Sequence, residues 1–227
     1  MLTINLTNKK IKQTINKIFC LAYTIAITAL LACGDEKTAE QQKVVTVEEQ
    51  PKQIAEGVEE LTIEESQAYT LKGQEIAQQA FKALSGNLKK AMSEGGVKNA
   101  VKFCNVNESV IVDSLSKHYD VNIKRTSHKL RNEKNKPNAS EQEMIDYYLN
   151  ASKTTEDLFP EVKRNTDNTV SFYAPIHLQP LCVTCHGTVG KRVSETDYKS
   201  ILALYPNDKA IDFDIDEFRG IWSITFK

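Results

Sequence analysis

The chain contains one C-x-x-C-H motif, Cys182-Val183-Thr184-Cys185-His186. This pattern is the signature for covalent attachment of a c-type haem. The two thiols of such a motif form thioethers with the haem, and the adjacent imidazole is delivered to one axial face of the iron. The motif therefore predicts one covalent haem c that is held by Cys182 and Cys185, with His186 as an iron ligand.

Two other uses of paired cysteines agree less well with the sequence. A zinc half-site needs two further ligands, and the sequence contains no second C-x-x-C and no H-x₃₋₅-H pair. A thioredoxin-like dithiol requires a βαβ pattern around the motif, and no such pattern flanks it. The spacing therefore favours haem attachment.

The N-terminal residues have the composition of an export signal. Four lysines and no acidic residue lie within residues 1–19, and an apolar run follows over 18–32. This run is shorter than the roughly 20 residues that a spanning helix needs. It ends in Leu30-Leu31-Ala32-Cys33-Gly34, which resembles a bacterial lipobox. We expect a lipoprotein signal peptide over 1–32 and a lipid anchor on Cys33, which would attach the protein to a membrane of the bacterial cell envelope, facing the periplasm or in the outer membrane.

Charge and composition divide the rest of the chain. The sequence has 29 basic and 30 acidic residues, and removal of the signal with its four lysines leaves a net charge of −5. This balance argues against a nucleic-acid partner. Residues 33–60 are rich in Glu, Gln, Lys and Thr, which predicts a flexible acidic tether. Residues 61–227 are enough for one domain with one core.

Helical periodicity dominates the first half of this domain. The capping box Thr62-x-x-Glu65 starts a helix that we expect to end near Gly86. A second helix opens at Gly95-Gly96, and a third starts at Ser140-x-x-Glu143. A short helix is predicted over 198–205.

Strand patterns follow the helices. They cover 121–125, 170–174 before Pro175, and 221–226, where Trp222, Ile224 and Phe226 share a face. Helices ahead of short antiparallel strands predict an α+β fold with segregated layers.

The second axial ligand of the iron is open at this point. The candidates are His118, His128, His177, Met92, Met144 and Cys104. Cys20 lies in the signal, Cys33 is the lipidation site, and the motif uses two more cysteines, so Cys104 is the thiol without a role. It lies in the apolar stripe of the second predicted helix, where it is either a ligand or a small buried hydrophobe.

Four further residues are candidates for contact with the haem. We place Arg125 and Arg131 near the propionates because a guanidinium group matches a carboxylate bidentately, although each could equally be a solvated surface arginine. Tyr173 and Trp222 could pack on the porphyrin, but aromatic residues at strand spacing also commonly fill a core.

Several separated motifs resemble a bacterial single-haem domain family that was long labelled a domain of unknown function. They are Phe103-Cys104, Arg125-Thr126-Ser127, Leu130-Arg131-Asn132 with Asn135, Pro137 and Glu143, Pro175-Ile176, Leu181 to Gly187, Tyr205 to Ala210, and Phe218 to Ser223. The resemblance covers Ser66 to Lys227. It implies a PAS-like α+β fold, with an antiparallel sheet and N-terminal helices packed around a c-type haem. It also implies axial ligation by histidine and by a cysteine from the early helix, a position that matches Cys104.

These features together give an expected function. We expect an extracytoplasmic lipoprotein with one covalent haem that senses redox state or a diatomic gas and passes the signal to a separate redox or signalling protein. The alternative is a single-haem, low-potential electron-transfer protein. Two axial ligands from the protein would fill the coordination sphere of the iron, so we do not expect an enzyme.

Overall fold

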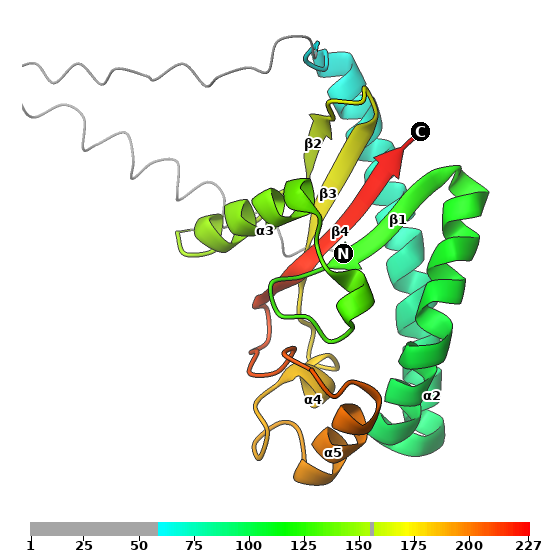
Figure 1. Ribbon diagram of the computed structural model, residues 1–227, viewed down its shortest axis with the longest axis vertical. Coiled ribbons are helices and arrows are strands. Elements are labelled where there is room, and N and C mark those ends of the chain that lie inside the picture. The colour runs from blue at the N-terminus through cyan, green and yellow to red at the C-terminus, as the bar shows by residue number, and fades with distance from the viewer. Residues whose placement is uncertain (1–58, 155–156) are drawn as a thin grey trace, which may run out of the picture. The chain divides into compact units, whose positions relative to one another are not determined.

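A computed structural model describes residues 59–154 and 157–227 of the chain (Figure 1). The signal predicted over 1–32, Cys33 and all but the last two residues of the tether predicted over 33–60 lie outside the described residues. In chain order the elements are α2 (Ile63–Tyr119), β1 (Val121–Thr126), the 3₁₀ helix η1 (Glu133–Asn135), α3 (Ala139–Ala151), β2 (Glu161–Arg164), β3 (Val170–His177), α4 (Val183–His186), α5 (Glu195–Leu204) and β4 (Phe218–Phe226).

The four strands form one sheet in the order β1-β4-β3-β2, and each neighbouring pair is antiparallel. The last strand of the chain, β4, therefore lies inside the sheet, between β1 and β3 (Figure 1). The register between β3 and β4 shifts at Ile176 and His177. Helices and an antiparallel sheet confirm the predicted α+β class.

The long helix α2 begins as predicted and bends later than predicted. Thr62 caps it, and the Thr62 side chain and the Glu65 side chain each accept a hydrogen bond from the backbone N–H of the other residue. The helix does not end near Gly86, because one glycine costs a helix only about 1 kcal/mol. It bends at Gly95 and Gly96, where Gly96 has a φ of +64° that favours glycine. We call 63–94 the first arm and 97–119 the second arm.

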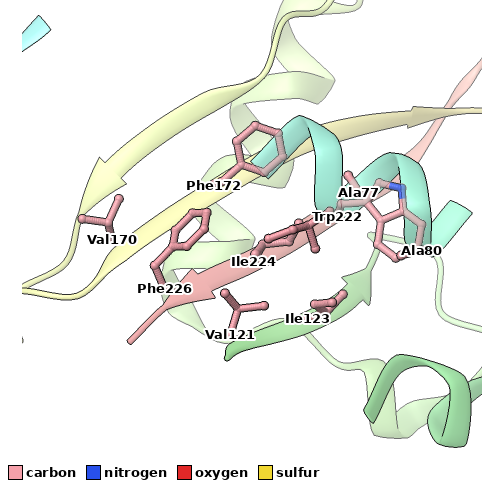
Figure 2. Close-up of a cluster of buried hydrophobic side chains, with 10 residues drawn as sticks. Ala77, Ala80, Val121, Ile123, Val170, Phe172, Trp222, Ile224 and Phe226 are labelled. Atoms are coloured by element: carbon pink, nitrogen blue, oxygen red, sulfur yellow. The ribbon is translucent and has the colours of Figure 1, made fainter. Parts of the chain in front are cut away.

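The main core lies between α2 and one face of the sheet (Figure 2). Its buried members are Ile76, Ala77 and Ala80 from the first arm, Val121 and Ile123 from β1, Val170 and Phe172 from β3, and Trp222, Ile224 and Phe226 from β4. The first arm approaches the sheet closely at Gly73, where a Cβ atom would lie 2.2 Å from the ring of Phe172. The predicted common face of Trp222, Ile224 and Phe226 is confirmed.

A second buried hydrophobic cluster lies between α3 and the strand residues that do not point toward α2. Met144, Ile145 and Tyr148 of α3 pack with Tyr173 of β3 and with Phe218 and Ile221 of β4. Side chains of successive strand residues point to opposite faces, so α3 covers the face that α2 leaves free.

Helix α3 begins slightly earlier than the sequence pattern predicted. Its capping box is Asn138 with Glu141, and not Ser140 with Glu143. Pro137 favours an extended backbone at the preceding residue, Lys136, just ahead of the helix start, and Asn138 is a preferred N-cap residue. The buried carboxylate of Glu141 accepts a further hydrogen bond from Lys124 at 2.6 Å.

Two strands differ from the predicted pattern. β2 was not predicted, because Glu161-Val162-Lys163-Arg164 is mostly charged. β3 continues through Pro175, which was expected to stop it. Pro175 is tolerated because β2 pairs with β3 only as far as Tyr173, so β3 has a single partner strand at the proline.

The segment between β3 and β4 packs against the bend of α2. Val97 and Val101 of the second arm are buried with Val193, with Ile201 of α5 and with Tyr205. Figure 1 shows α4 and α5 beyond one end of the sheet, next to the bend. In residues 59–154 and 157–227, no helix is both long enough and apolar enough to cross a membrane.

Candidate functional site

A cavity of about 240 Å³ lies between the bend of α2, the end of the sheet and α4. Its wall includes the six described residues that were predicted to attach the haem, to ligate its iron or to contact its propionates, namely Cys104, Arg125, Arg131, Cys182, Cys185 and His186. These residues come from segments up to 82 positions apart in the sequence, and the fold brings them together. The seventh candidate, Cys33, lies outside the described residues.

The C-x-x-C-H motif forms a single helical turn. The backbone N–H groups of Cys185 and His186 donate to the carbonyl oxygen of Cys182 at 3.1 and 3.0 Å. Residues three and four positions apart lie on the same side of a helix. The turn therefore presents both thiols and the imidazole to the same cavity.

The His186 imidazole is oriented by its backbone surroundings. Its Nδ1 lies 2.7 Å from the carbonyl oxygen of Ala210. A carbonyl oxygen can only accept, so Nδ1 carries the proton and Nε2 keeps a free lone pair. Desolvation, together with the positive charge of Arg131, lowers the pKa of His186 well below its usual value. A neutral imidazole with a free Nε2 is the form that binds iron.

Arg131 joins three parts of the site. Its guanidinium group donates to both carboxylate oxygens of Asp208 at 3.1 Å. It also donates to the carbonyl oxygen of Cys185 at 2.6 Å and to that of Ala210 at 3.1 Å. The Ala210 carbonyl is the same atom that accepts from His186. Arg131 therefore fixes the motif backbone and the acceptor of the histidine.

The thiols on the cavity wall are half-buried and free. Burial raises the pKa of Cys104 to about 11, while the positive charge of Arg125 opposes the rise. Burial also raises the pKa of Cys185. Without a metal these two thiols are protonated at neutral pH, and a metal that bound one of them would displace the proton.

The other candidate axial ligands fall into two groups. Met92 and His177 line the cavity, and the Nδ1 of His177 lies 2.8 Å from the carbonyl oxygen of Asp216. The remaining three lie elsewhere in the fold. His118 packs edge-on against Tyr119, His128 stacks on Phe218 with ring centroids 6.0 Å apart, and Met144 is buried in the α3 cluster.

Of the other residues predicted to contact the haem, some line the cavity and one does not. Arg125 forms an ion pair with Glu108, and its guanidinium lies 5.5 Å from the ring centre of Trp222. Arg125, Glu108 and Trp222 all line the cavity. Tyr173 is buried in the α3 cluster. Trp222 is thus the member of the aromatic pair that the structure places at the cavity wall.

Two residues at the site were not singled out from the sequence. Asp208, whose side chain is 0% exposed, is the carboxylate partner of Arg131. Arg219 lines the cavity beside Ser127, and the two side chains are hydrogen-bonded. Arg219 is the charged residue of an otherwise mostly apolar strand, and this pattern could have indicated a functional role.

Among residues 59–154 and 157–227, no cluster of three or more His, Cys, Asp or Glu side chains could hold a metal ion. A zinc site made of protein ligands alone would need such a cluster.

Comparison with known proteins decides the family. The sequence model of the Tll0287-like family matches residues 34–227. The chain belongs to the Tll0287-like family. This membership confirms the family resemblance in the sequence. No curated protein matches this Tll0287-like chain.

A solved structure resembles the fold of this Tll0287-like protein. It is described as the crystal structure of the cyanobacterial heme-protein Tll0287. The two sequences are 20% identical, and the TM-score is 0.51. The match covers 68% of this chain and 92% of the other chain. At this identity, the likeness establishes a shared fold.

Proposed function

We propose that this protein binds one haem c, covalently through Cys182 and Cys185, with His186 as an axial ligand of the iron. The observation that carries the proposal is the C-x-x-C-H turn, which presents both thiols and the free Nε2 of His186 to one cavity. The description of the solved relative as a heme-protein agrees with it.

The residues present fit such a group. Most of the cavity wall is apolar, as a porphyrin ring requires, with contributions from Leu84, Leu88, Ile176, Leu181 and Trp222. The wall also contains two buried polar atoms without a hydrogen-bond partner in the described structure, Nε of Arg125 and Oγ1 of Thr126. Orphaned donors beside an apolar cavity are expected where a ligand with carboxylate groups completes the site.

We propose Cys104 as the second axial ligand. It lines the same cavity as His186 and belongs to the second arm of α2. Burial raises the pKa of the Cys104 thiol to about 11, and the positive charge of Arg125 opposes that rise, so Arg125 would help to stabilise the thiolate once a metal displaced the proton. With two protein ligands on the iron no position is left for a substrate, so we propose a protein that is not an enzyme.

The second arm supports sensing over simple electron transfer. The bound iron would supply a one-electron change between ferric and ferrous states. Cys104 lies on the second arm, which Gly95 and Gly96 separate from the first arm, and the second arm packs against the main core farther along, at Val112, Leu115 and Tyr119. Release of the thiol on reduction, or in the presence of a diatomic gas, would let this arm shift its packing and report the event to a separate redox or signalling protein. Electron transfer requires the thiol to stay in place in both redox states.

Spectra of the two redox states distinguish these functions. We expect the ferric protein to give the low-spin signal of a thiolate ligand in electron paramagnetic resonance, and we expect Cys104→Ala to lose it because alanine cannot ligate iron. We expect the absorption spectrum of the ferrous protein to show that the thiolate has left. Met92→Leu is the control, because Met92 also lines the cavity. An unchanged thiolate-ligated spectrum in both states would establish electron transfer instead.

We also propose that the protein is a lipoprotein of the bacterial cell envelope. The support is the apolar run over 18–32 followed by the lipobox-like sequence at Cys33. Mass spectrometry of the mature N-terminus is expected to find Cys33 as the first residue, with acyl chains attached, and Cys33→Ala is expected to remain unacylated. An N-terminus before Cys33 in the mature protein would contradict the anchor.

A further inference from the structure

Three guanidinium groups line the cavity, and they differ in their partners. Arg131 forms an ion pair with the carboxylate of Asp208, and Arg125 forms one with the carboxylate of Glu108. Arg219 hydrogen-bonds the hydroxyl group of Ser127 and lies over the ring of Phe213, with 5.3 Å to the ring centre. Among residues 59–154 and 157–227, no carboxylate forms an ion pair with Arg219. Of the three guanidinium groups on the wall, Arg219 is thus the one that no described carboxylate pairs with.

The backbone places Arg219 where a ligand can reach it. The next residue, Gly220, has a φ of +156°, and a Cβ atom there would lie 2.3 Å from the carbonyl oxygen of Thr126. This close approach brings Arg219 against the end of β1. The Ser127 hydroxyl donates to the Arg219 carbonyl oxygen at 2.6 Å and accepts from the Arg219 guanidinium. The position of the side chain is thus fixed from both ends.

A cation in this position is costly without a counter-charge. Removing an ion from water is unfavourable unless an opposite charge compensates for the lost hydration. Burial, followed by the repulsion from Arg131 and Arg125, lowers the pKa of Arg219 to about 9, so the group is still charged at neutral pH. An anionic group inside the cavity would relieve both effects.

We propose that Arg219 binds a carboxylate of the ligand in this cavity, namely a propionate of the bound haem. The inference rests on the proposed haem binding. A guanidinium group matches a carboxylate with two parallel hydrogen bonds, and Ser127 orients it for that contact. Arg131, whose donors already serve Asp208, Cys185 and Ala210, is instead a positioning residue for the motif.

The test uses the haem-loaded protein with three variants. Arg219→Gln removes the charge, Arg219→Lys keeps it without the two parallel donors, and Arg192→Gln is the control. Arg192 is 46% exposed, pairs with Asp214 at 3.8 Å and does not line the cavity. The measurements are haem content, the midpoint potential of the iron, and the propionate bending bands in the resonance Raman spectrum.

We expect every variant to keep its covalent haem, because the thioethers do not involve Arg219. Arg219→Gln should lower the midpoint potential, because loss of a nearby positive charge stabilises the ferric state, and it should shift a propionate band. Arg219→Lys should keep most of the potential and still shift the band, so this variant carries the test if Arg219→Gln does not fold. Arg192→Gln should match the unaltered protein.

Two results would overturn the inference. A haem-loaded Arg219→Gln protein with the potential and Raman bands of Arg192→Gln would show that Arg219 does not contact a propionate, while the haem content would still support the proposed function. Absence of haem from the unaltered protein would refute both proposals.

Discussion

Replacement of both Cys182 and Cys185 by alanine is expected to abolish covalent haem attachment. The two thiols are the groups of the C-x-x-C-H turn that form the thioether bonds, and no other described thiol lies on that turn. After expression in a host that matures c-type cytochromes, the unaltered protein should show one haem per chain by pyridine haemochrome and retain it on a denaturing gel stained for haem. The double variant should show none on that gel.

Cys104→Ala is the matched control for this experiment. It removes a half-buried thiol from the same cavity wall, but that thiol lies on α2 and outside the motif. We expect it to keep a full covalent haem, and each single substitution in the motif to give a haemochrome spectrum intermediate between those of c-type and non-covalent haem. Haem on the denatured double variant would contradict the assignment of the two cysteines.

Asp208→Asn is expected to cause the largest loss of stability among single substitutions at the site. The carboxylate is 0% exposed and holds Arg131, which is only 13% exposed, through both oxygens. It also accepts from the backbone N–H of Ala210 at 3.0 Å. Breaking a buried ion pair by removing one partner typically costs about 3–5 kcal/mol, because a buried charge is left unpaired. Denaturant unfolding of the haem-loaded protein measures this loss.

The control for this prediction is Asp214→Asn. Asp214 is 86% exposed and lies 3.8 Å from Arg192, which makes a surface pair. Such pairs contribute between 0 and about 1 kcal/mol. We expect the free energy of unfolding of this variant to stay within about 1 kcal/mol of the unaltered protein. Equal stability of the two variants would show that the Asp208 pair does not hold the site together.

The sequence predicted those parts of the fold that depend on local pattern. The capping box at Thr62 and the alternating face of β4 were found because their signals lie within a few residues. The end of the first helical segment was placed at Gly86 because a glycine and a helix break are often associated. The helix continues through Gly86, and a Cβ atom there would meet no described atom within 4 Å beyond its chain neighbours and the local helix backbone. β2 carries charged residues and is a strand because β3 pairs with it.

In the candidate site, too, the residues with a local sequence signal were predicted and the tertiary contacts were not. Cys182, Cys185 and His186 were predicted from a five-residue motif. The pattern left Cys104 as either a ligand or a small buried hydrophobe, and the family resemblance implied that it is a ligand. The partners of the arginines could not be found this way. Asp208 lies 77 positions from Arg131, and Arg219 lies 92 positions from Ser127. Whether a buried charge is paired depends on the tertiary structure, which short-range spacing does not encode.

The place of β4 in the sheet has a consequence for biosynthesis. The ribosome makes this strand after β1, β2 and β3, but β1 and β3 both need it as their partner. Until those nine residues emerge and dock, the two neighbouring strands have open edges and the thiols at 182 and 185 belong to an unfinished domain. If the protein binds haem c as proposed, an attachment enzyme would reach both sulfur atoms before the domain closes around the porphyrin.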